Sequence, residues 1–158
     1  MHPFTDTRPP HLAWLLGLSG LIPFVSAALS IWGIPIGWQP LVVASLLSYS
    51  AVILAFMGAI HWGLAMRGEQ DDLRAQMQLG LSVIPPLLGW AVVSLASFGL
   101  PATLAIPLFV LAFLGMYMAD LRAVRLGLAP IWYRPLRKPL TAVVVVSLLV
   151  AWAGVLAG

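Results

Sequence analysis

Five long apolar runs constrain this chain more than any other feature. They cover roughly residues 11–32, 41–66, 76–98, 102–121 and 139–157, and short polar or turn-rich segments join them. Apolar residues make up 61% of the chain and charged residues 8%, whereas about one-quarter of a soluble domain is charged. Each run approaches the roughly 20 residues that a membrane-spanning helix needs. The sequence therefore predicts an all-α integral membrane bundle of five transmembrane helices in a single domain over residues 1–158.

The first run also has a second interpretation. Arg8 precedes the apolar stretch, and Val25-Ser26-Ala27 is similar to a signal-peptidase cleavage site, so the segment also fits a cleaved leader. Because the apolar stretch continues past that site to a length that suits a span, we predict a membrane helix here.

The basic residues lie on one side of the predicted topology. Five spans place the two termini on opposite sides, and all eight basic residues then fall on the N-terminal side. They are Arg8, Arg67, Arg74, Arg122, Arg125, Arg134, Arg137 and Lys138. The positive-inside rule predicts that the N-terminus lies in the cytoplasm and the C-terminus outside. We expect the membrane to be a bacterial inner membrane.

The charge balance also bears on partners. The net charge of +3 is accounted for by the membrane topology, so we predict no nucleic-acid partner. The lipid bilayer is the expected partner, and other membrane protein subunits are a further candidate.

Prolines interrupt three of the predicted spans, at Pro23, at the pair Pro85 and Pro86, and at Pro107. Each proline lacks an N–H and leaves the carbonyl four residues earlier without its helical partner. We therefore predict that three of the five helices are proline-kinked. The kinks either shape the packing permanently or act as hinges of the transporter type.

The end of the second run holds the most unusual chemistry. His61 lies inside an apolar segment, about 9 Å along the helix from Arg67 at 1.5 Å per residue. Asp120 is the only acid inside a predicted span and lies at a similar depth. Ionisable groups in a span need partners. Either His61 and Asp120 share a polar pocket on the N-terminal side, or Asp120 pairs with Arg67, Arg122 or Arg125.

The candidate pocket has further members. Ser50 lies about three helical turns before His61 and shares its face. Trp62 adjoins His61, and Arg67 and Arg122 follow the apolar parts of their spans. For Ser50 the alternative is hydrogen bonding that holds the bundle together.

Two other patterns concern packing. Ala55, Ala59 and Gly63 recur at every fourth position, which predicts a stripe of small residues where another helix approaches closely. Trp132 and Tyr133 lie in the basic segment 122–138, where we predict that they anchor the protein at the membrane interface.

The sequence lacks the usual signs of catalysis. It has no cysteine, no nucleophile elbow, no glycine-rich phosphate loop and no paired carboxylates. His61 has no second histidine or glutamate three or four residues away, so we predict no metal site and no cofactor.

Several stretches resemble the transmembrane protein 69 family, a group of small bacterial and mitochondrial membrane proteins without an assigned activity. The most specific stretch is residues 58–63 (GAIHWG). The similarity continues through residues 83–85 (VIP), 120–122 (DLR), 128–133 (LAPIWY) and 136–141 (LRKPLT). The resemblance implies a membrane protein of five spans. The pair Pro85 and Pro86 departs from the single proline of the family, so no family hinge is implied.

Two functions are compatible with these features. The first is a non-enzymatic accessory or assembly partner of a larger membrane complex, favoured by the small size and the small-residue stripe. The second is a small transporter or ligand-binding membrane protein with a pocket around His61 and Asp120. An integral-membrane enzyme is the least supported reading.

Overall fold

The computed structural model describes residues 8–67 and 73–158. Its helices form five candidate membrane spans, which confirms the predicted helical bundle. The elements in chain order are α1 (His11–Ser19) and α2 (Ile22–Gly33), the 3-10 turn η1 (Ile36–Trp38) and α3 (Gln39–Ala65), α4 (Leu73–Ser82) and α5 (Ile84–Ser97), α6 (Ala102–Arg125), and α7 (Tyr133–Ala157).

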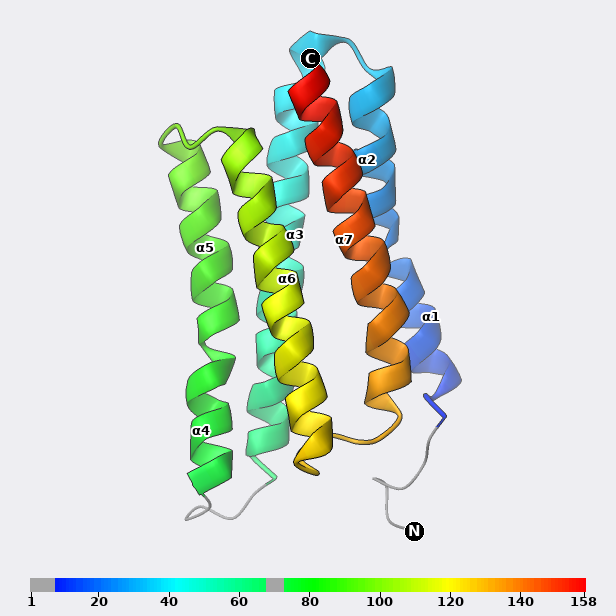
Figure 1. The fold of residues 1–158 in the computed structure, drawn as a ribbon, viewed down its shortest axis with the longest axis vertical. Coiled ribbons are helices and arrows are strands. Elements are labelled where there is room, and N and C mark those ends of the chain that lie inside the picture. Colours follow the sequence, from blue (N-terminus) through cyan, green and yellow to red (C-terminus); the bar gives the residue numbers. More distant parts are fainter. Residues whose placement is uncertain (1–7, 68–72) are drawn as a thin grey trace.

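Helix α3 is the most connected element of the bundle. It contacts α2, α4, α5 and α6, while α7 packs against α2 and α6. Helices α4 and α5 both pack against α3, and α5 also contacts α6 (Figure 1). The start of α1 and the end of α7 lie at opposite ends of the bundle (Figure 1). This arrangement leaves one side of α6 facing α4 and α5.

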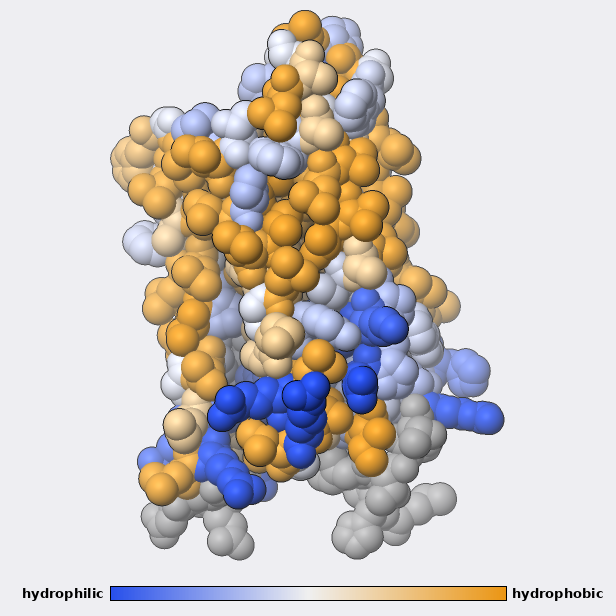
Figure 2. Space-filling view, viewed as in Figure 1, coloured by the Kyte–Doolittle hydropathy of each residue, from blue (hydrophilic) through white to orange (hydrophobic). Residues whose placement is uncertain are grey.

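The core is apolar and the outer surface is apolar as well. Phe24, Phe109 and Phe113 are fully buried, and the ring of Phe24 meets that of Phe113 edge-on at 5.8 Å between centroids. Large apolar side chains such as Leu29 and Trp90 are exposed, and they form a broad apolar surface over the helices (Figure 2). An apolar exterior of this extent is what a bilayer-embedded bundle presents.

Hydrophilic residues gather near one end of the molecule, the end at which α1 begins and α6 stops (Figure 2). Arg122 and Arg125 lie in the last turn of α6, and Arg134 lies in the first turn of α7. We call this the basic end of the bundle. The described basic residues therefore lie on the same side as the start of the first span, as the topology predicts.

The prolines affect the helices unequally. Pro23 lies in the first turn of α2, and residues 20–21 separate it from α1. Pro85 lies in the first turn of α5, and Val83 separates it from α4. Helix α6 continues through Pro107, and the Thr103 carbonyl oxygen accepts a hydrogen bond from Trp152 Nε1 at 2.9 Å. Breaks thus accompany prolines in two spans, and kinking of all three stays a prediction.

The last two spans are longer at the basic end than the hydropathy indicates. Helix α6 extends to Arg125 instead of residue 121, and α7 begins at Tyr133 instead of residue 139. The connection between them therefore shrinks to residues 126–132. Basic side chains that the hydropathy assigns to a loop therefore lie on helices. This difference determines which residues form the site described below.

Candidate functional site

A buried carboxylate joins three helices at the basic end. Asp120 of α6 is 1% exposed. Its Oδ1 accepts a hydrogen bond from Nε2 of His61 on α3 at 2.9 Å. Its Oδ2 accepts one from Nε of Arg137 on α7 at 2.7 Å. Asp120 thus bonds to His61, as the first alternative predicts, and to an arginine, as the second predicts. The arginine, however, is not Arg67, Arg122 or Arg125.

One assignment of protons satisfies all of these contacts. Arg137 is always protonated, and its charge balances that of an ionised Asp120. A neutral His61 that donates from Nε2 then carries a lone pair on Nδ1. Nδ1 lies 3.3 Å from Nε2 of Gln78 on α4, which is a suitable donor. With that assignment, four helices meet in one charge-balanced network, which is the arrangement that a low-dielectric interior favours.

Arg137 is held by apolar neighbours as well as by Asp120. A terminal nitrogen of its guanidinium lies 3.2 Å from the Sδ of Met57, and the guanidinium carbon lies 6.0 Å from the centroid of the Tyr133 ring. Only 11% of the Arg137 side chain is exposed. This packing keeps the guanidinium inside the bundle although Arg137 lies near the start of its helix.

A glycine allows α3 to approach the broken third span. A Cβ on Gly58 would collide with the carbonyl oxygen of Ser82 and would lie 3.0 Å from Cδ of Pro86. Pro86 leaves that carbonyl without its usual helical donor. Because Gly58 has no side chain, α3 lies directly against the break between α4 and α5. The approach brings Gln78 within reach of His61, one turn along α3 from Gly58.

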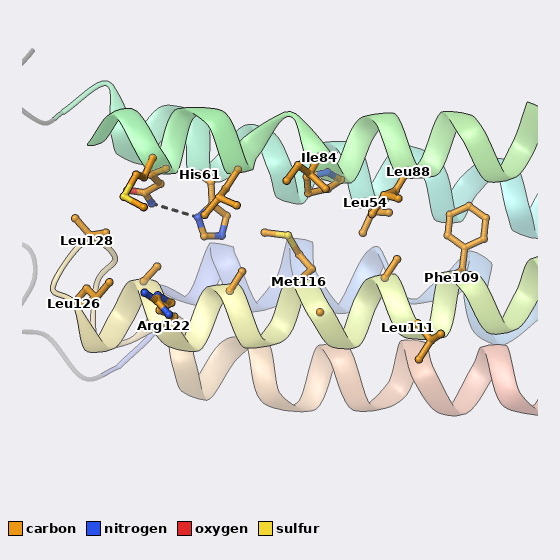
Figure 3. Close-up of a pocket in the computed structure, with 18 of the residues that line it drawn as sticks. Leu54, His61, Ile84, Leu88, Phe109, Leu111, Met116, Arg122, Leu126 and Leu128 are labelled. Carbon is orange, nitrogen blue, oxygen red and sulfur yellow. Dashed lines mark hydrogen bonds between the residues drawn. The ribbon is translucent and has the colours of Figure 1, made fainter. Parts of the chain in front are cut away.

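His61 and Gln78 also face a lateral groove with a volume of about 790 Å³. Helices α4 and α5 form one wall and α6 the other (Figure 3). Leu81 is 56% exposed and Leu111 is 65% exposed, so the groove opens toward the bilayer. Arg122 lies near one end with Leu126 and Leu128, and Phe109 lies toward the other (Figure 3).

The remaining predicted pocket residues separate into two groups. Arg122 lines the groove. Ser50 is buried but donates its hydrogen bond to the Leu46 carbonyl of its own helix at 2.7 Å, and it does not line the groove. Trp62 and Arg67 are exposed and do not line it either. The pocket membership predicted for Ser50, Trp62 and Arg67 is therefore wrong. Trp62 is the residue after His61, so its side chain points to a different side of the helix, toward the outside of the bundle.

The packing predictions need two corrections. Ala59 and Gly63 are exposed, and a Cβ on Gly63 would meet nothing within 4 Å, so no described helix packs on this end of the stripe that begins at Ala55. The close contacts of α3 lie at Gly58 instead.

The second correction concerns the aromatic anchors. Tyr133 is 6% exposed and packs in a small cluster with Ala123 and Ala129, so it is not an interface anchor. Trp132 is partly exposed and packs edge-on against Tyr133.

Arg137 and Gln78 are the functional residues that sequence reasoning missed. Arg137 lies just before the last predicted span, and Gln78 lies at the start of the third, where an exposed position is the usual outcome for a polar residue.

Within residues 8–67 and 73–158, no group of three His, Asp or Glu side chains has a metal-binding arrangement.

Comparison with known proteins places the chain among uncharacterised membrane proteins. The family described as "Protein of unknown function (DUF3429)" matches residues 9–153. The chain belongs to this family. Transmembrane protein 69 of Xenopus tropicalis is 35% identical over 142 residues, which cover 88% of this chain and 53% of that protein. Transmembrane protein 69 of Mus musculus is 31% identical over 84 residues, which cover 53% of this chain and 34% of that protein. No solved structure matches the chain.

These matches confirm the resemblance to the transmembrane protein 69 family, although the chain spans about half or less of the length of these relatives. Three of the five stretches that carry the family resemblance meet in the structure. Residues 58–63 supply His61, residues 120–122 supply Asp120, and residues 136–141 supply Arg137. These three stretches therefore share one buried hydrogen-bonded network.

Proposed function

We propose that this protein binds an amphipathic small molecule from the membrane in the groove between α4–α5 and α6. The observation that supports this most is the position of His61. The ring is held from behind by Asp120 at 2.9 Å, and it lines the groove. A polar group fixed in a mainly apolar groove suits recognition of a ligand that is mainly apolar with one polar part.

The contact between Gln78 and His61 supports an exchangeable role. The bond from Gln78 Nε2 to His61 Nδ1 is 3.3 Å long, weaker than the short bonds that hold Asp120. A donor group on a ligand can replace Gln78 at Nδ1 without disturbing the bond from Nε2 to Asp120. The bonds of Asp120 to His61 and Arg137 therefore stay in place whether the groove is empty or filled.

The groove offers a variant that blocks it without disturbing the fold. Gly115 of α6 lines the groove, and a Cβ added there would meet nothing within 4 Å. Gly115→Leu should fill the groove. Gly63→Leu is the matched control, because Gly63 also has open space but lies on the outside of α3.

The experiment is native mass spectrometry of the protein released from its membranes in a mild detergent. We expect the wild type and Gly63→Leu to carry a bound small molecule that Gly115→Leu lacks. His61→Leu should lower the bound fraction while leaving the apolar walls unchanged. Equal retention by wild type and Gly115→Leu would refute binding in the groove.

A second candidate is an accessory role in a larger membrane complex. It is favoured by the exposed stripe of Ala59 and Gly63, which has room for a helix of another subunit. If a partner packs there, Gly63→Leu should abolish co-purification in mild detergent, whereas Gly115→Leu should not. Isolation as a lone chain under all mild conditions counts against this role.

We also propose that the basic end faces the cytoplasm of a bacterial inner membrane, on the basis of the positive-inside rule. A reporter fused after Gly158 should be active only on the external side of the membrane. Cytoplasmic activity of that fusion would reverse the assignment.

A further inference from the structure

The groove has different chemistry at its two ends. Arg74 in the first turn of α4 and Arg122 in the last turn of α6 line it at the basic end, as His61 and Gln78 also line it. Farther along, its walls are apolar and include Ile84 and Leu88 on α5 and Leu108 and Leu111 on α6. The groove is therefore complementary to a molecule with an anionic group at one end and a long apolar part at the other.

The length of the groove fits one half of a bilayer. Leu108 and Arg122 line it on the same helix, and 14 residues at 1.5 Å per residue span about 21 Å. The hydrocarbon thickness of one leaflet is about 15 Å, half of the roughly 30 Å core. The arginines then lie at the level of lipid head groups, while Leu108 lies near the middle of the membrane.

The floor on α6 is made of small residues. Ala112, Gly115 and Ala119 line the groove on one face of α6. Such stripes commonly receive a neighbouring helix, but here the wall opposite is α4–α5, and Gly115 has nothing within 4 Å of an added Cβ. The missing side chain at Gly115 therefore leaves open space along this face of α6.

We propose that the groove binds one anionic phospholipid of the leaflet at the basic end. Its phosphate lies between Arg74 and Arg122, and one acyl chain lies along α6 toward Leu108. Guanidinium groups bind phosphate through charge-assisted and often bidentate hydrogen bonds. A zwitterionic lipid would bring its own cation near the same two arginines, so a net negative charge is favoured. This inference rests on the proposed function, because it names the chemical class of the groove ligand.

The test uses two lipids that differ in the head group. Purified, delipidated protein in a neutral detergent receives dioleoylphosphatidylglycerol or dioleoylphosphatidylcholine, and native mass spectrometry measures the lipid-bound fraction over a concentration series. We expect tighter binding of the phosphatidylglycerol. Arg74→Gln and Arg122→Gln should each weaken it about tenfold, the loss expected for one hydrogen bond to a charged group. Arg125→Gln is the control, because Arg125 lies on the same turn region of α6 but does not line the groove.

The blocking variant separates the two proposals. If Gly115→Leu loses both lipids while Gly63→Leu keeps them, the groove is the binding site. The two lipids could in addition bind the wild type equally, with no change in binding for Arg74→Gln or Arg122→Gln. In that case the preference for an anionic lipid is wrong, although binding in the groove stands. If Gly115→Leu binds phosphatidylglycerol as the wild type does, both proposals are overturned. Thermal unfolding of each variant in the same detergent checks that it is folded.

Discussion

The two halves of the bundle are held together by different interactions. In the half away from the basic end, Phe24, Phe109 and Phe113 pack in a core of apolar side chains. At the basic end, Asp120 bonds to His61 and Arg137 across three helices. Lipid tails are as apolar as leucine, so apolar packing between helices gains little from exclusion of water. At the basic end, hydrogen bonds between individual side chains therefore determine which helices are neighbours.

The groove begins at the basic end, beside this network. Hydrogen bonds hold α3, α6 and α7 around Asp120, whereas α4 reaches the network through the longer contact between Gln78 and His61. The α4–α5 pair packs closely on α3 at Gly58, and the groove lies between this pair and α6.

The largest effect is expected from removing the buried carboxylate. Asp120→Leu leaves the guanidinium of Arg137 and the Nε2–H of His61 without their partner. Breaking a buried ion pair in this way costs about 3–5 kcal/mol. Thermal unfolding of the purified protein in detergent should show a large loss, whereas Arg125→Gln at the exposed end of α6 should change little.

A second variant tests the cause of that loss. Asp120→Leu combined with Arg137→Leu removes both charges, so the double variant should be more stable than Asp120→Leu alone. If the double variant is less stable than the single one, the unpaired arginine is not the source of the destabilisation.

The next effect concerns the helix approach that positions Gln78. Gly58→Leu would push a side chain into the backbone at Ser82, so α3 and α4–α5 must separate. Overpacking of this kind costs about 1–3 kcal/mol, and we expect a value near the upper limit because the obstructing atoms are backbone. Gly115→Leu is the control in the same unfolding measurement. Similar stability of the two variants would show that the close approach at Gly58 does not matter.

These residues also show how far the sequence predicts the site. His61 and Asp120 are both ionisable, lie at the same depth and belong to helices that run in the same direction, so the sequence predicts that each needs a partner. It leaves two alternatives open, a pocket shared by the two side chains or pairing of Asp120 with an arginine. The depth of a residue and the direction of its span are readable from hydropathy, whereas the choice between these partners is not.

Arg137 was not predictable in the same way. Hydropathy places the start of the last span at residue 139, whereas α7 begins at Tyr133. A basic, proline-containing segment is typical of a loop, and only tertiary contacts with Asp120 and Met57 show that it continues the helix inward. Likewise, the Ala55, Ala59 and Gly63 pattern identifies a face of α3 but does not identify what covers that face. Helix rotation is decided by packing, which a single sequence does not display.

A double-mutant cycle measures the strength of the polar network directly. His61→Leu and Asp120→Asn each remove one side of the 2.9 Å bond. Residues in one hydrogen-bonded network show non-additivity of about 0.5–3 kcal/mol, and we expect about 1–2 kcal/mol here, with the double variant losing less than the sum. The comparison cycle joins His61→Leu with Phe113→Leu, which lies in the apolar half, and should be additive. A coupling of zero between His61 and Asp120 would contradict the network.

The smallest effect concerns the two neighbouring positions at the end of α3. The small-residue pattern predicts that Gly63→Leu disrupts the bundle more than Leu64→Ala does, and the structure reverses this order. A side chain on Gly63 meets nothing within 4 Å, and replacing glycine in a helix removes a penalty of about 1 kcal/mol. Leu64 packs against the cluster of Ala123, Ala129 and Tyr133, so Leu64→Ala loses contacts. Because Leu64 is half-buried, we expect a loss of about 1 kcal/mol, below the 2–5 kcal/mol typical of fully buried leucines. Unfolding in detergent should therefore rank Gly63→Leu as the more stable variant, and the opposite ranking would mean that another helix covers Gly63 even in the isolated protein.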